Sequence, residues 1–225
     1  EAMQLKHLPQ LADRERARRF AQPMLTPRRT GGSAGIYLAP ALSPDGRNIV
    51  FLSTGSFARA EVFLDLFLGD ANTGKTIKRL TKSTLNPEFE ELRSAYSQSA
   101  FSPDGRMVAF TAQRQGKDVL YLLDVRTRRE VRRLDTGLDQ MIGPTFSPDG
   151  RQIIFSGSTG GLSDLYMIDT DGRNLRRLTE DPWGDHQPNW SPDGRKVAFA
   201  SERGEENDLE TLRLSNWRIS VLDLE

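Results

Sequence analysis

The pentapeptide SPDGR occurs four times in this chain, at Ser43–Arg47, Ser102–Arg106, Ser147–Arg151 and Ser191–Arg195. Successive copies begin 59, 45 and 44 residues apart. In such a turn, proline fixes φ at the second position and glycine tolerates a left-handed backbone at the fourth. The sequence therefore predicts one tight turn repeated in four units. The expected structural turn residues are Ser43, Pro44, Asp45, Gly46, Ser102, Pro103, Asp104, Gly105, Ser147, Pro148, Asp149, Gly150, Ser191, Pro192, Asp193 and Gly194.

The residues around each turn repeat as well. A large apolar residue precedes each serine, and a phenylalanine follows it at a fixed offset, which predicts equivalent buried positions on two strands joined by the turn. The preceding residues are Leu42, Phe101, Phe146 and Trp190, and the phenylalanines are Phe51, Phe110, Phe155 and Phe199.

Two further segments complete the repeated unit. A third strand is expected at 65–70, 119–124, 164–169 and 218–223, and a short basic fourth strand at 77–81, 131–135 and 175–179. Four short antiparallel strands in about 40–45 residues is the period of a β-propeller blade. A β-sandwich is the alternative, but it does not explain why the same four-strand unit recurs with the same turn.

The predicted fold is therefore all-β: a β-propeller of four-stranded antiparallel blades, with four repeats and the last one incomplete. We expect a helical or linker segment at 1–35 and the propeller at 36–225. The blades are expected at approximately 36–81, 97–135, 141–179 and 186–225.

SPDGR followed by a Phe-bearing strand, LYxxD and RRLT resembles the TolB-like propeller repeat. This resemblance implies a bacterial envelope protein, located in the periplasm, and a fragment of a larger six- or seven-bladed propeller. The segments 40–53 and 155–169 further resemble large multidomain envelope proteins in which a zinc metallopeptidase precedes the propeller. Similar blades also occur beside the catalytic domains of prolyl-oligopeptidase-like peptidases.

Composition excludes several classes of function. Basic and acidic residues balance at 31 each, which argues against a nucleic-acid partner. The chain has no cysteine, no HExxH motif and no apolar run long enough to span a membrane. Ser33, in GGSAG, matches the sequence pattern of a nucleophile elbow but not its structural context, because the elbow needs a strand before it and a helix after it, whereas here a basic linker precedes and a strand follows. We therefore expect no catalytic residue, no metal and no cofactor.

Loop lengths and one histidine indicate where a partner could bind. Loops 53–61, 82–96 and 201–215 are insertions on one face of the propeller, and such loops commonly carry binding sites. Asp185 and His186 are a possible ligand contact near the axis on the same face. The basic pairs of the fourth strands, such as Arg132 and Arg133, are interpreted as edge-protecting charges.

The sequence favours a non-catalytic propeller scaffold that binds protein or peptide in the cell envelope. The alternative is a propeller that gates or positions substrate for a peptidase domain outside this chain. Because the last unit lacks its fourth strand, we also expect an open edge at 218–223 and an exposed apolar face that includes Trp190 and Phe199.

Overall fold

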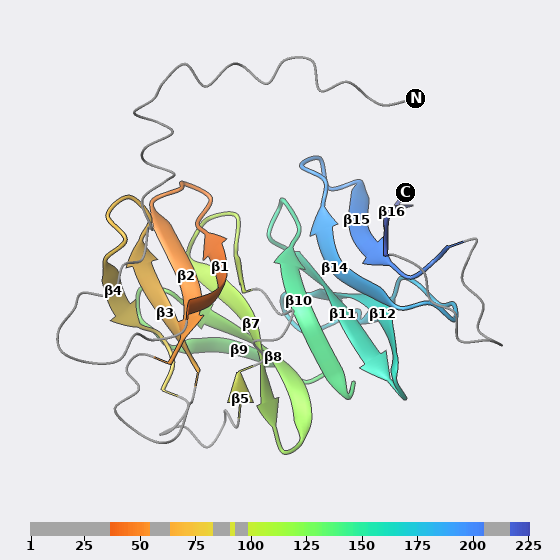
Figure 1. Ribbon diagram of the computed structural model, residues 1–225, viewed down its shortest axis with the longest axis horizontal. Coiled ribbons are helices and arrows are strands. Elements are labelled where there is room, and N and C mark those ends of the chain that lie inside the picture. Colours follow the sequence, from red (N-terminus) through yellow and green to blue (C-terminus); the bar gives the residue numbers. More distant parts are fainter. Residues whose placement is uncertain (1–36, 55–63, 83–90, 93–98, 205–216) are drawn as a thin grey trace, which may run out of the picture.

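A computed structural model describes residues 37–54, 64–82, 91–92, 99–204 and 217–225, and in these residues all regular structure is β. The sheets follow one another in chain order (Figure 1). The first contains β1 (Tyr37–Leu42), β2 (Asn48–Ser53), β3 (Asp65–Asp70) and β4 (Thr76–Arg79). The second contains β5 (Glu91–Leu92), β6 (Ala100–Phe101), β7 (Met107–Arg114), β8 (Lys117–Asp124) and β9 (Glu130–Leu134). The third contains β10 (Gln140–Phe146), β11 (Gln152–Thr159), β12 (Leu162–Asp169) and β13 (Arg176–Arg177). The fourth contains β14 (Asp185–Trp190), β15 (Lys196–Ser201) and β16 (Arg218–Asp223).

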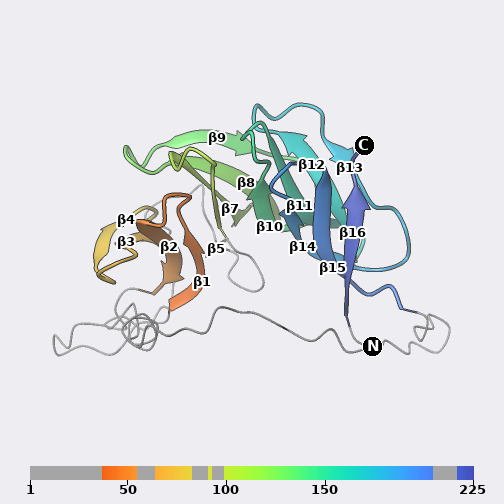
Figure 2. The same ribbon diagram turned by 90° about the horizontal axis from the view of Figure 1, so that it is seen from above.

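The four sheets are blades arranged in an arc, as the view from above shows (Figure 2). Within each blade, neighbouring strands are antiparallel. Three apolar clusters join blade 1 to blade 2, blade 2 to blade 3, and blade 3 to blade 4. The core of the molecule therefore lies between blades, because a single sheet cannot cover both of its own faces. These findings confirm the predicted propeller architecture.

The four repeated phenylalanines occupy equivalent buried positions, each at most 5% exposed. Phe110 belongs to the cluster against blade 1, and Phe199 belongs to the cluster against blade 3. Trp190 packs in that same cluster. The prediction that Trp190 and Phe199 face outward from blade 4 is therefore wrong: these positions look back toward the preceding blade.

The outward face of blade 4 is instead formed by β16. Ile219 and Val221 stand 78% and 62% exposed. By strand register they correspond to Leu165 and Met167 of blade 3, which are fully buried against blade 4. At the other end of the arc, Leu42 is 58% exposed, although its counterparts before the other three turns pack against a preceding blade. The expected exposed apolar face is thus present, but with different residues.

Each SPDG turn is closed by the same hydrogen bonds. In blade 3, the Ser147 hydroxyl donates to Asp149 Oδ1 at 2.6 Å and accepts from the backbone N–H of Gln152 at 2.9 Å. Asp149 Oδ1 also accepts from the backbone N–H of Arg151 at 3.0 Å. These bonds lower the pKa of Asp149, the serine hydroxyl contributing most. Serine, aspartate and glycine therefore recur together because one turn geometry requires all three.

Successive turns also touch one another. A Cβ added to Gly150 would lie 3.3 Å from Cδ of Pro103, and one added to Gly194 would lie 3.6 Å from Cδ of Pro148. Gly105 approaches Pro44 in the same way, at 3.8 Å. Each glycine, held at positive φ, thus leaves room for the proline of the preceding blade. Gly46, in the first turn, has no such neighbour within 4 Å.

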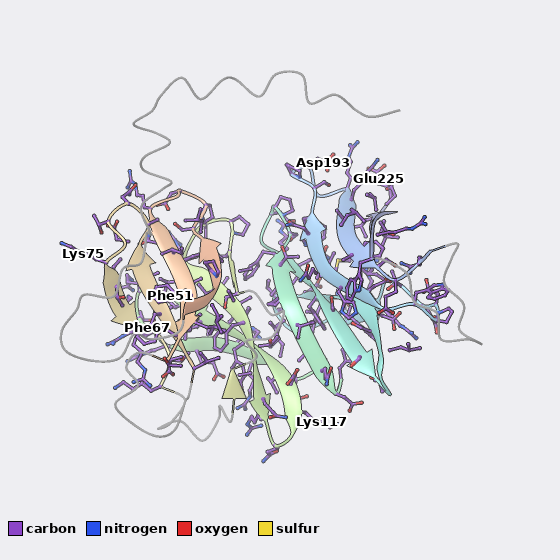
Figure 3. All side chains as sticks on the ribbon, in the orientation of Figure 1. Phe51, Phe67, Lys75, Lys117, Asp193 and Glu225 are labelled. Atoms are coloured by element: carbon purple, nitrogen blue, oxygen red, sulfur yellow. The ribbon has the colours of Figure 1, made fainter. Side chains whose placement is uncertain are left out.

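The turns joining first to second strands and third to fourth strands lie on one face. In blade 3 they are linked by the hydrogen bond from Thr170 N–H to Arg151 O, 2.8 Å long. Asp193 and Glu225 of blade 4 lie together at the end of the molecule opposite Lys117, which belongs to the β7–β8 hairpin (Figure 3). The two faces expected from blade topology are therefore present.

One local expectation is wrong, and a second is incomplete. The segment 82–96 is not entirely a connection, because Glu91–Leu92 forms β5 and pairs with β7. The basic residues of the fourth strands are more than edge charges: Lys78 Nζ donates to Arg126 O of blade 2 at 3.2 Å, and Arg132 Nη1 donates to Asp171 O of blade 3 at 3.0 Å. They therefore link consecutive blades. The segment 1–35, including Ser33, lies outside the described residues.

Candidate functional site

The innermost strands carry a bulge at the same place in three blades. Ala39, Gly143 and Gln187 have positive φ values of 49°, 63° and 53°, and each immediately precedes a proline. The register with the second strand shifts there, between His186 and Asn189 in blade 4. Proline cannot donate to the ladder and is tolerated in a strand at such bulges. His186 thus lies at the last paired position before the bulge of β14.

Asp185, at the start of β14, is completely buried. Its two carboxylate oxygens accept hydrogen bonds from Arg203, Oδ1 from Nη1 at 2.6 Å and Oδ2 from Nη2 at 2.8 Å. Its backbone oxygen accepts from Ser163 Oγ of blade 3 at 3.1 Å. A bidentate pair of this kind compensates the burial of the carboxylate. Asp185, which directly precedes His186, therefore holds Arg203 in place, and its backbone oxygen joins blade 4 to blade 3 by a hydrogen bond.

Arg203 also connects Asp185 to the loop before β14. Its Nε donates to Asp181 Oδ2 at 2.9 Å, so a single guanidinium holds two carboxylates. Its Cζ lies 5.5 Å from the centroid of the Phe199 ring. In the other blades the equivalent phenylalanine stacks on an aromatic of the third strand, as Phe155 does on Tyr166 at 6.0 Å. Blade 4 has serine at that third-strand position, and the arginine contacts the ring instead.

His186 is half-buried above this network, and its ring lies 4.7 Å from that of Trp217, tilted by 37°. Burial lowers the pKa of His186, while the charges of Glu202 and Asp185 oppose the shift. Glu202 is close by, since its Oε2 accepts from the backbone N–H of Gly184 at 3.1 Å. Trp217 is 54% exposed. The result is a surface aromatic pair flanked by a carboxylate.

Such a pair can contact a ligand through its aromatic faces and through hydrogen bonds of the imidazole and carboxylate. We call His186, Glu202 and Trp217 the rim site. Its residues flank the fourth-to-first-strand loop before β14 and the β15–β16 loop, so it lies on the face of the predicted insertions. Most of the loops 53–61, 82–96 and 201–215 falls outside the described residues.

Sequence reasoning found His186 but missed Trp217 and Arg203. Trp217 stands two residues after the 201–215 loop, and no residue spacing relates it to His186. Arg203 and Asp185 are likewise 18 residues apart and meet only because β14 and β15 pair. No group of three or more histidine, cysteine or acidic residues suited to a metal ion occurs among the described residues.

A hollow lies on the turn face of blade 3. It is a shallow depression of about 460 Å³ lined by Asp149, Arg151, Gln152, Asp169, Thr170 and Asp171. Hydrogen bonds from Asn174 and Gln152 lower the pKa of Asp169. Its acidic groups are thus already engaged in turn structure, as those of Asp149 are, so we regard the rim site as the better candidate.

Comparison with known proteins places the fold in a family. Residues 89–221 match the family described as the TolB beta propeller domain, which is more than half of the chain. The chain belongs to the TolB β-propeller family. Among the described residues of this TolB-family chain, none forms a helix of the length and apolarity that crossing a membrane requires.

Solved structures agree with this assignment. A protein assigned as TolB from Agrobacterium tumefaciens is 27% identical with a TM-score of 0.65, over 83% of this chain and 61% of its own. TolB from Acinetobacter baumannii is 26% identical with a TM-score of 0.64, over 84% of this chain and 41% of its own. The TolB-family chain therefore spans roughly half the length of these relatives. Kuenenia stuttgartiensis hydrazine synthase, at 18% identity and a TM-score of 0.56, shares the fold. A comparison with curated protein sequences gives no match.

Proposed function

We propose that this chain is a non-catalytic propeller scaffold that binds a protein or peptide in the periplasm of a bacterium. The observation that supports the proposal is the TolB match over residues 89–221, together with TolB structures that align with more than four-fifths of the chain. A rigid arc of blades suits this role, because it displays loops from fixed positions without any moving part.

The partner contacts the face that carries the insertion loops and the rim site. Trp217 supplies a large apolar surface, and tryptophan is among the residues that dominate binding energy at interfaces. His186, neutral at physiological pH because burial lowers its pKa, offers a hydrogen bond without a charge. An extended segment with an apolar side chain at its centre fits this combination.

The test is selection of peptides from a displayed random library on immobilised chain, followed by affinity measurements with variants. Trp217→Ala should weaken the binding of a selected peptide by at least about thirtyfold, since hot-spot losses are about 2 kcal/mol or more. Val131→Ala is the matched control, because Val131 is 53% exposed on β9, away from the rim site. It should leave the affinity unchanged.

Failure would take a clear form. Peptides that bind equally to wild type, Trp217→Ala and His186→Ala would remove the rim site from the proposal. If instead no displayed peptide and no protein of a periplasmic extract binds the chain, the scaffold function itself is wrong. Hydrolysis of any selected peptide by the purified chain would refute a non-catalytic role.

A further inference from the structure

In blades 1 and 3, one ion pair joins the third strand to the fourth. The first residue of β3 is the buried Asp65, which is ion-paired with Arg79 of β4. In blade 3 the equivalent Asp164, also buried, pairs with Arg177 of β13 at 2.6 Å between Oδ2 and Nη2. Each arginine lies opposite the aromatic two residues after the aspartate, as Arg177 does opposite Tyr166.

A second contact fixes the register of these strands. The backbone N–H of Leu165 donates to Thr179 Oγ1 at 2.9 Å, and the N–H of Leu178 donates to Leu165 O at 2.7 Å. Blade 1 repeats both bonds with Leu66, Leu80 and Thr81, at 2.9 and 2.7 Å. In blades 1 and 3 the fourth strand therefore pairs through an arginine, a leucine and a threonine in sequence. Blade 2 lacks this set, because Val119 and Asp135 stand at the positions of the aspartate and the threonine.

Blade 4 has a residue of opposite charge at the position of Asp164. Alignment of the β15–β16 register with blade 3 places Arg218 where Asp164 stands, and Ile219 where Leu165 stands. Arg218 is exposed and has no ion pair with any residue that the structure describes. Among those residues, β16 pairs with β15 alone. Ile219 and its neighbour Val221 are also exposed.

We propose that the free edge of β16 binds an antiparallel strand that carries an acidic residue, followed by leucine and threonine. The acidic side chain lies opposite Ser220 and pairs diagonally with Arg218, as Arg177 does with Asp164. The leucine and threonine repeat the backbone contacts at Ile219. The arginine-bearing fourth strands of this same chain are poor occupants, because they would place two guanidinium groups together. Arg218 thus selects its partner strand by charge and disfavours strands borrowed from a second copy.

The experiment extends the full chain at Glu225 with the blade 3 segment Gly172–Thr179, which provides a turn and a fourth strand. One extension keeps the arginine that corresponds to Arg177, and the other has glutamate in its place. Each is attached to wild type and to Arg218→Asp, giving a four-member cycle. Covalent attachment keeps the effective concentration of the strand high.

We expect the glutamate extension to stabilise wild type more than the arginine extension does, and the order to reverse with Arg218→Asp. The coupling should change the unfolding equilibrium constant by roughly tenfold. Hydrogen exchange gives a readout that separates strand addition from charge effects alone: the N–H of Ile219 should gain protection with the matched extension only.

Two results overturn the proposal. The first is that the two extensions stabilise wild type and Arg218→Asp equally, or leave the Ile219 N–H unprotected. The other is a dimer of the unextended chain, seen by sedimentation, in which that N–H is already protected, because a second copy would then occupy the edge.

Discussion

Leu165 and Ile219 occupy the same strand position in adjacent blades, yet their surroundings differ completely. Leu165 is fully buried between blades 3 and 4, whereas Ile219 is 78% exposed. Replacing Leu165 by alanine removes three carbon atoms, worth roughly 2.4 kcal/mol of transfer free energy at about 0.8 kcal/mol each. The cavity left behind adds to this, so we expect a loss of about 3 kcal/mol or more.

Ile219→Ala is the matched control. A substitution at an exposed site changes the free energy of unfolding by about 0.5 kcal/mol or less. Both variants should be measured in urea titrations followed by circular dichroism and by tryptophan fluorescence, because Trp190 packs at the interface under test. Stacked repeats do not always unfold in one step, so coincidence of the two probes has to be checked first.

The changes in the free energy of unfolding of these two variants test both the packing between blades and the exposure of β16. If Ile219→Ala costs as much as Leu165→Ala, the outer face of β16 is covered in solution, and the open face described above is wrong. If Leu165→Ala costs less than about 1 kcal/mol, packing between blades is not what stabilises the arc.

Four other substitutions test the remaining contacts. Gly46→Ala and Gly150→Ala share the cost of alanine at positive φ, about 1–2 kcal/mol, but only Gly150→Ala forces a methyl group to within 3.3 Å of Pro103, so its thermal midpoint should fall further. Because burial lowers the folded-state pKa of His186, the folded protein favours the neutral imidazole, and wild type should lose stability as pH falls below the unfolded histidine pKa of about 6.5. His186→Asn should remove this loss of stability. Asp149→Asn should make acid unfolding less steep, because the lowered pKa of this carboxyl gives stability that is present above about pH 4 and lost as pH falls through the folded value.

Sequence predicted the parts of the fold that are set locally. The SPDG turns depend on residues within one pentapeptide and its flanks, and the burial of Phe51 and its counterparts follows from a fixed offset. The direction in which those faces point was not predictable, because alternation along a strand distinguishes two faces without saying which neighbouring blade each meets. Trp190 was therefore placed on the wrong side of its blade.

The candidate site was less accessible to prediction. The Asp185–Arg203 pair and the His186–Trp217 contact join residues whose separation in sequence follows no repeat. The bulge at Gln187 left only an indirect signal, the proline that follows it. Contacts that depend on how two loops approach each other are set by the assembled blades and carry no local pattern.

The repeated contact between the turn glycine of one blade and the turn proline of the blade before it bears on how such a protein can change in evolution. Because every junction uses the same positions, a duplicated unit of 44 or 45 residues would meet suitable partners on both sides as soon as it appeared. Gene duplication or unequal recombination could therefore alter the number of blades without redesign of any junction. Change in the insertion loops, by contrast, proceeds one blade at a time, which allows new binding surfaces to diverge while the array itself is inherited intact.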